Sequence, residues 1–136
     1  MLTTFTVAHW CVLVMALVPV VCAGIAKSGM MSTPRRDGGY DNDNPRSWLS
    51  RQTDWRARAN SAQANTFEAL PFFFAAVIIA HQLQAPQWRI DLLALAFVGL
   101  RLAYVAAYVR NMANLRSAVW VMACLVNVAL LFCGFR

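Results

Sequence analysis

Polar residues at helical spacing are the part of this chain best suited to chemistry. Between positions 51 and 68, charged or hydrogen-bonding side chains recur every three or four residues: Arg51, Asp54, Arg58, Ser61, Asn65 and Glu68. On an α-helix this spacing places them all on one face. The same segment continues without a break into the apolar stretch 72–80. Because an ionisable group inside a bilayer costs roughly 2.5–3.5 kcal/mol, we expect these groups to mark a binding site or a buried pairing.

The next apolar segment carries complementary groups. Arg101, Tyr104 and Tyr108 stand at positions i, i+3 and i+7 and therefore share one helix face. Arg101 and Glu68 fall at similar depths on antiparallel helices, which predicts an ion pair between them. Arg116, at the start of the last apolar segment, lies on the same side of the membrane, and the sequence offers it no structural partner. Together these residues predict a polar pocket between helices that opens toward the cytosol.

The helix that carries the polar face should have neighbours on several sides. A second polar stripe lies on its far side, and small residues separate the two stripes: Ala57, Ala59, Ala62, Ala64 and Ala69. Small side chains let helix backbones approach closely inside a membrane. We therefore expect this helix to lie at the centre of an assembly, away from lipid.

The composition sets the fold class. Of 136 residues, 60% are hydrophobic and 13% are charged, whereas soluble domains average about 45–50% apolar and about 25% charged residues. The apolar segments 5–26, 62–83, 90–109 and 115–135 are each near the ~20 residues that a membrane-spanning helix needs. The chain is predicted to be an all-α membrane protein in which residues 1–136 form one four-helix transmembrane bundle. No Lys or Arg precedes Lys27, so a retained helix is favoured over a signal peptide for the first segment.

The basic residues predict the orientation. Seven of the twelve Lys and Arg residues lie between the first two apolar segments: Lys27, Arg35, Arg36, Arg46, Arg51, Arg56 and Arg58. Short loops rich in Lys and Arg stay in the cytosol, so residues 28–50 should form a polar cytosolic loop and both termini should face outward. The net charge of +6 then reflects orientation, and nothing in the sequence suggests nucleic-acid binding.

The residues that often bind metals lack the spacing of a metal site. The four cysteines sit inside apolar segments without a CxxC pair. Residues 41–44 alternate Asp and Asn, but the Gly and the closing Glu of a calcium-binding loop do not follow, so a turn is favoured. His9 and His81 fall near the outward ends of their helices, where interfacial or hydrogen-bonded histidines are expected rather than metal ligands. No metal site is predicted.

These motifs resemble the MAPEG family, the membrane-associated proteins of eicosanoid and glutathione metabolism. The resemblance rests on Asn65-x-x-Glu68-x-x-Pro71 preceded by Arg58, on Arg101-x-x-Tyr104-x-x-x-Tyr108, and on Arg116-Ser117. Short bacterial members look most similar, which implies a bacterial inner membrane. The family implies a homotrimer that binds glutathione between subunits and acts on lipophilic small molecules. The implied glutathione-binding residues are Arg58, Asn65, Glu68, Arg101, Tyr104 and Tyr108, and the implied catalytic residue is Arg116, which stabilises the glutathione thiolate.

Two positions depart from the family pattern. Ser61 stands where characterised enzymes often have an arginine, and Ala69 stands where some have a tyrosine. Fewer donors for the glutathione carboxylates imply weaker binding or a different ligand. Arg58, one turn before Ser61, is in position to supply a replacement donor.

Three functions fit the sequence. The first is a glutathione-dependent transferase or peroxidase acting on lipophilic electrophiles. The second is a non-catalytic relative that binds a lipid or a partner protein, with Asn65, Glu68 and Arg101 holding the assembly together. The third is a small four-helix exporter, but exporters of this size carry an essential carboxylate in the first span, and residues 5–26 contain no acidic residue.

Overall fold

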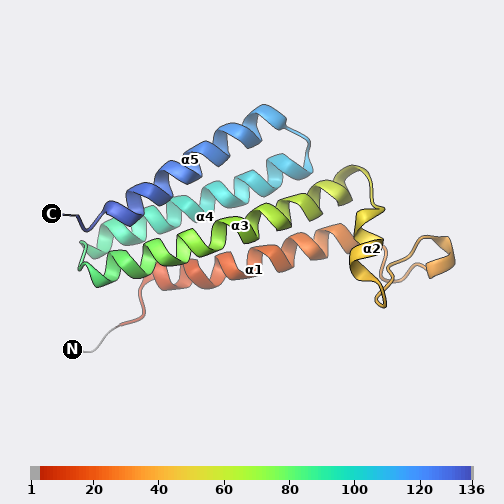
Figure 1. The fold of residues 1–136 in the computed structure, drawn as a ribbon, viewed down its shortest axis with the longest axis horizontal. Coiled ribbons are helices and arrows are strands. Elements are labelled where there is room, and N and C mark those ends of the chain that lie inside the picture. The colour runs from red at the N-terminus through yellow and green to blue at the C-terminus, as the bar shows by residue number, and fades with distance from the viewer. Residues whose placement is uncertain (1–3, 136) are drawn as a thin grey trace.

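Four long helices form the fold, which is a computed structural model describing residues 4–135. They are α1 (Val7–Lys27), α3 (Asp54–Gln82), α4 (Gln87–Val109) and α5 (Ala113–Phe132), and each is long and apolar enough to cross a membrane. They run alongside one another, with α3 packed on α1, α4 and α5 (Figure 1). The predicted all-α, four-helix membrane fold is thus confirmed, and the polar segment that begins at Asp54 does share one helix with the apolar stretch 72–80.

The two ends of the bundle differ. At the end that we call the terminal end, the start of α1 and the end of α5 lie on the same side of the bundle as the α3–α4 connection (Figure 1). At the other end, here the loop end, residues 28–53 join α1 to α3 and residues 110–112 join α4 to α5. The predicted site residues Arg58, Tyr108 and Arg116 all lie near the loop end.

A tight helix termination joins α4 to α5. Asn111 adopts a left-handed backbone conformation with φ of 60°. Its N–H donates to the carbonyl of Tyr108 at 3.0 Å, and the N–H of Met112 donates to the carbonyl of Ala107 at 2.9 Å. This is the Schellman pattern, which satisfies carbonyls left open at a helix end. The short connection places Tyr108 and Arg116 on neighbouring helices.

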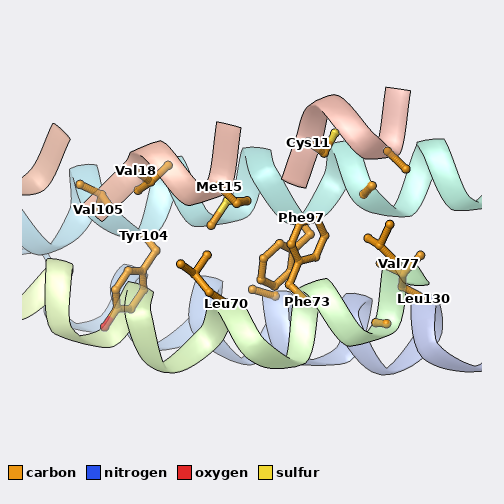
Figure 2. Close-up of a cluster of buried hydrophobic side chains, with 14 of the residues drawn as sticks. Cys11, Met15, Val18, Leu70, Phe73, Val77, Phe97, Tyr104, Val105 and Leu130 are labelled. Atoms are coloured by element: carbon orange, nitrogen blue, oxygen red, sulfur yellow. The ribbon is translucent and has the colours of Figure 1, made fainter. Parts of the chain in front are cut away.

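Apolar side chains from all four helices fill the core. Phe73 of α3 and Phe97 of α4 stack face to face, with ring centroids 4.4 Å apart and an interplanar angle of 8°. Met15 of α1 and Leu130 of α5 are fully buried in the same cluster (Figure 2). The outer faces of α1, α4 and α5 remain apolar and exposed, as lipid-facing helices require. The core therefore holds α3 and α4 in fixed register, which positions the polar groups on both.

The loop of residues 28–53 is more structured than the sequence predicted. It contains a 3₁₀ turn (Arg35–Asp37) and a short helix, α2 (Pro45–Ser50). The sequence indicated only turns here, because six residues are too few for helical periodicity to be visible. Trp48 of α2 is 3% exposed, and its Nε1 donates to the carbonyl of Gly38 at 3.1 Å. This one aromatic residue anchors the loop.

Asp41 organises the charged part of the loop. Partial desolvation would raise the pKa of Asp41, but the backbone N–H of Asp43, the amide of Asn44 and the guanidinium of Arg35 hold that pKa below its ordinary value. Among residues 4–135, ion pairs occur only in this loop, and the shortest joins Arg35 to Asp43 at 2.6 Å. The helices of the bundle are held by packing and hydrogen bonds.

Candidate functional site

Arg101 is the most deeply buried charged group that the structure describes. It lies eight residues before the end of α4, about 12 Å from that end at the helical rise of 1.5 Å. Its side chain is among the largest fully buried ones, with 1% exposure. Its Nη2 donates to Asn65 Oδ1 at 3.0 Å and to Thr66 Oγ1 at 3.2 Å, both on α3. Thr66 in turn donates its hydroxyl proton to the carbonyl of Ala62 at 2.8 Å.

The predicted Glu68–Arg101 ion pair is wrong as a direct contact. Glu68 accepts a hydrogen bond from Asn65 Nδ2 at 3.3 Å, and it is Asn65 that meets Arg101. Glu68 itself is exposed on the outer surface of α3. Helical spacing correctly placed the two charges at similar depth, but Asn65, one turn before Glu68, points more directly at α4. The amide of Asn65 thus bridges Glu68 and Arg101 by hydrogen bonds. The carboxylate of Glu68 keeps acceptor capacity for another group.

Arg101, Tyr104, Tyr108 and Arg116 form a continuous column. The guanidinium carbon of Arg101 lies 4.3 Å from the ring centroid of Tyr104. The rings of Tyr104 and Tyr108 meet edge to face with centroids 5.6 Å apart. The guanidinium carbon of Arg116 lies 4.4 Å from the ring centroid of Tyr108. Such contacts combine cation–π and aromatic attraction. The column runs from the buried interior to the partly exposed Arg116 at the loop end.

Arg116 has the partner that the sequence did not show. The Tyr108 ring supports its guanidinium from one side, but among the described residues Arg116 forms no ion pair and no hydrogen bond through its side chain. When a guanidinium stacks on an aromatic ring, the N–H donors in its own plane remain available for hydrogen bonds. Arg116 is therefore oriented and still able to bind an anion.

Arg58 stands apart from the column. Its Nε donates to the carbonyl of Val109 at 2.9 Å, at the C-terminal end of α4. A cation at this place satisfies an open carbonyl and interacts favourably with the helix dipole. The structure thus gives Arg58 a structural contact one residue away from Tyr108. Its remaining guanidinium nitrogens are available at the edge of the site.

The structure adds two residues that sequence reasoning missed. Thr66, like Asn65, accepts a hydrogen bond from Arg101. Asn127 of α5 is 3% exposed and lines the same cavity as Arg101. Asn127 was visible in the sequence as the lone amide in the apolar stretch 119–132. Amides inside a membrane helix usually seek a partner, and that signal would have identified it.

Both histidines lie away from this site, at the terminal end. Their ring centroids are 4.6 Å apart. His9 Nδ1 accepts the backbone N–H of Thr6 at 3.0 Å, and His81 Nδ1 lies 2.8 Å from the carbonyl of Val77. The prediction of hydrogen-bonded histidines is confirmed.

Comparison with known proteins bears on this arrangement. The model of the MAPEG family matches residues 7–136, essentially the whole chain. The chain belongs to the MAPEG family. No curated protein and no solved structure gives a significant match. The predicted resemblance is confirmed, and the molecule is a four-helix membrane protein of the glutathione and eicosanoid metabolism type.

Within this MAPEG protein, all but one of the predicted site residues come together in one group. Asn65, Glu68 and Arg101 are linked by hydrogen bonds between α3 and α4. Tyr104, Tyr108 and Arg116 continue that group toward the loop end. Arg58 is the one predicted site residue whose hydrogen bond leads elsewhere, to the carbonyl of Val109 at the end of α4.

Proposed function

We propose that this MAPEG protein is a glutathione-dependent transferase or peroxidase acting on lipophilic electrophiles. One observation carries the proposal: Arg116 is held on the ring of Tyr108 at the open end of the column, with no anion paired to it among residues 4–135. A guanidinium that is oriented but unpaired is suited to bind a thiolate. Arg116 is the proposed catalytic residue.

The thiol of glutathione is a weak nucleophile until it ionises. A free thiol has a pKa near ~8.5, so little of it is anionic at neutral pH. A neighbouring guanidinium, shielded from water, favours the anion. Lowering the thiol pKa from ~8.5 to ~6.5 requires about 2.7 kcal/mol of differential stabilisation. One well-placed, partly buried arginine supplies an interaction of that size.

The remaining polar groups fit the rest of the tripeptide. Glutathione carries an ammonium group and two carboxylates besides its thiol. The exposed carboxylate of Glu68 suits the ammonium, and Arg58 and the Tyr108 hydroxyl can donate to carboxylates. Asn65 and Arg101 hold Glu68 in place, and Tyr104 holds Tyr108. The donor set therefore matches the ligand, with Ser61 and Ala69 leaving fewer donors than usual.

The exposed polar row on α3 supports a homotrimer. Asp54, Ser61 and Glu68 are exposed on the surface of a single chain, whereas Arg51, predicted to share their helix face, lies before α3 at the end of α2. Polar groups on a spanning helix are costly in lipid, so a second copy that covers this row would relieve that cost. Glutathione would then lie between subunits, next to α3 of one copy. The bacterial inner membrane and a cytosolic loop end belong to the same proposal.

Two reactions suit an activated glutathione thiolate. In conjugation, the sulfur forms a bond to an electrophilic carbon, and the leaving group departs or the resulting carbanion takes up a proton. In peroxide reduction, a lipid hydroperoxide and two glutathione molecules give an alcohol, water and glutathione disulfide. The exposed apolar faces of α1 and α5 let the lipophilic partner approach laterally from the bilayer.

Arg116→Ala tests the catalytic assignment, and Arg110→Ala is the matched control. Both arginines lie at the loop end, but Arg110 is exposed and outside the column. Ultraviolet difference spectra of the glutathione complex should show thiolate absorbance in the wild type and in Arg110→Ala. Arg116→Ala should lose it and retain the assembled state in size-exclusion chromatography. Undiminished absorbance in Arg116→Ala would exclude that role.

The alternative is a non-catalytic relative that binds a lipid or a partner protein. The observation that favours it is the full burial of Arg101, whose bonds to Asn65 and Thr66 would serve stability alone. Calorimetry with glutathione, followed by conjugation of a chlorodinitrobenzene-type electrophile, distinguishes the two. The enzyme should bind glutathione and turn over the electrophile. Absence of binding at millimolar glutathione would favour the alternative.

A further inference from the structure

A groove runs along the outer surface of the bundle between α1 and α4, near the loop end. Its volume is about 320 Å³, which lies within the range of about 300–1,000 Å³ that is typical of ligand pockets. Helix α3 packs against both α1 and α4 but contributes no residue to the lining. The groove therefore opens on the side of the α1–α4 pair that faces away from α3, toward the acyl chains of the bilayer.

The groove has a buried apolar floor and exposed apolar edges. Val18 and Cys22 of α1 and Val105 of α4 form the floor and belong to the buried core cluster (Figure 2). Val21 and Leu102 form the edges, where they are 58% and 50% exposed. A hydrocarbon chain that lies between the edges contacts apolar atoms on three sides, which increases its dispersion contacts.

A single cation lies at the mouth of the groove. Among the residues that line it, Arg110 alone is charged. Arg110 directly follows α4, so it lies where the helix leaves the apolar region at the loop end. It is exposed, and the ion pairs within residues 4–135 do not include it. An apolar groove that ends at an available guanidinium matches an amphiphile with an anionic head group.

Two arginines of α3 hold the helix ends on both sides of the groove. Arg56 Nη1 donates to the carbonyl of Ser28 at 2.8 Å, directly after α1 ends. Arg58 Nε donates to the carbonyl of Val109 at 2.9 Å, at the end of α4. Because α3 binds both helix ends, the width of the groove is set before a ligand arrives. Such preorganisation lowers the free-energy cost of binding.

We propose that this groove binds an anionic glycerophospholipid from the leaflet at the loop end. One acyl chain lies between α1 and α4, and the phosphate accepts hydrogen bonds from Arg110. Basic pockets between spanning helices bind anionic lipid head groups in this way. A choline head group would bring its own cation toward Arg110 and toward Lys27 at the end of α1, so a zwitterionic lipid binds less well.

The lipid site does not rest on the proposed glutathione chemistry. Its lining includes neither Arg116 nor the tyrosines that support it. The groove also opens away from the polar row of α3, so it would still face lipid in the proposed homotrimer. Lipid binding and thiolate absorbance are measured separately, and either assignment can fail without the other.

The experiment is native mass spectrometry of the purified protein in detergent, without glutathione. Equimolar phosphatidylglycerol and phosphatidylcholine with identical palmitoyl-oleoyl chains compete for the protein, so only the head group differs. Phosphatidylglycerol should occupy the first bound position about fivefold more often than phosphatidylcholine. This ratio corresponds to the ~1 kcal/mol that one basic residue contributes to binding an anionic head group. Equal occupancy by the two lipids would overturn the proposal.

Two charge variants separate the groove from a general attraction to the basic loop end. Arg110→Gln removes the contact with the phosphate and should equalise the occupancies of the two lipids. Arg46→Gln is the matched control, because Arg46 is an exposed arginine of α2 at the same end of the bundle and outside the groove. It should keep the preference of the wild type. A preference retained in Arg110→Gln, or lost equally in Arg46→Gln, would overturn the assignment of Arg110.

A second pair of variants tests the position of the acyl chain. Ala106 lines the groove, and Ala103 lies on the same helix outside it. Both alanines are exposed, so a larger side chain at either position leaves the core packing unchanged. Ala106→Leu fills the groove and should reduce the occupancy of the first position by both lipids, whereas Ala103→Leu should bind like the wild type. Unchanged occupancy in Ala106→Leu would place the lipid elsewhere and overturn the proposal.

Discussion

Asp91 and Glu68 are carboxylates on two of the spanning helices, and their surroundings differ. At the terminal end, Asp91 Oδ1 accepts the backbone N–H of Ala8 at 2.9 Å and the amide of Gln87 at 2.9 Å. It therefore lies at the N-terminus of α1, where the helix dipole favours a negative charge. Glu68, midway along α3, is exposed and has one amide contact at 3.3 Å. One carboxylate is satisfied within the chain, and the other is exposed with a single amide contact.

The contrast extends to the neighbours of each carboxylate. At the terminal end, Thr6, His9 and His81 bond to one another or to nearby backbone. These contacts tie the start of α1 to the end of α3. On the Glu68 side, Arg116 is stacked on Tyr108 but forms no ion pair within residues 4–135, and Arg101 Nε has no acceptor there. Polar groups that a fold leaves open at some cost are the ones that a ligand can use. Under the proposed function, the terminal end therefore serves structure and the Glu68 side serves ligand binding.

Substitution of Arg101 should give the largest effect on stability. Arg101→Met removes two hydrogen bonds from a charged donor, each worth ~1.5–3 kcal/mol, so we expect a loss of about 3 kcal/mol or more in the free energy of unfolding. Arg101→Lys should recover only part of it, because an ammonium group lacks the planar fork. Thermal unfolding in detergent measures both.

The matched substitution at the terminal end is Asp91→Asn. The amide oxygen of Asn can still accept the N–H of Ala8, so the free energy of unfolding should fall by less than about 1 kcal/mol. If Asp91→Asn destabilised the protein as much as Arg101→Met, the two hydrogen bonds of Arg101 would not be the larger polar contribution to stability.

Glu68→Gln should affect binding more than stability. The amide preserves the size of the side chain and its contact with Asn65, but it removes the charge proposed to bind the glutathione ammonium. A charge-assisted hydrogen bond is worth ~1.5–3 kcal/mol, which corresponds to a roughly ten- to hundredfold rise in Kd. Calorimetry measures the affinity, and the unfolding midpoint serves as its control. A large fall in that midpoint at unchanged affinity would make Glu68 structural.

Much of this division was accessible from the sequence. Spacing placed Asn65 and Glu68 on one helix face and Arg101, Tyr104 and Tyr108 on another, because helical periodicity fixes faces without knowledge of packing. Apolar segment lengths gave the spanning helices within a few residues. The polar start of α3 was recognised as helical because its charged and amide residues recur every three or four positions. The same segment then continues without a break into the apolar part of the helix.

Helical periodicity alone could not predict which side chains make contact between helices. The rotation of α3 against α4 decides whether Asn65 or Glu68 meets Arg101, and side-chain packing such as the Phe73–Phe97 stack fixes that rotation. The stacking of Arg116 on Tyr108 depends on the tight connection at Asn111, a left-handed position that few sequence rules identify. Helix α2 is stabilised by the burial of Trp48, a tertiary effect that local propensity does not contain.

Thr6→Ala should give the smallest effect and the cleanest separation of the two regions. The Thr6 hydroxyl lies 2.8 Å from His9 Nδ1 at the start of α1, and loss of a helix-capping residue costs ~1 kcal/mol. Thr4→Ala, two residues earlier and exposed, should change nothing. Neither substitution should alter the thiolate absorbance or the affinity for glutathione, because the terminal end lies at the opposite end of the helices from Arg116 (Figure 1). A change in thiolate absorbance in Thr6→Ala would mean that the helices transmit the state of one end to the other, and the terminal end would then contribute to the site.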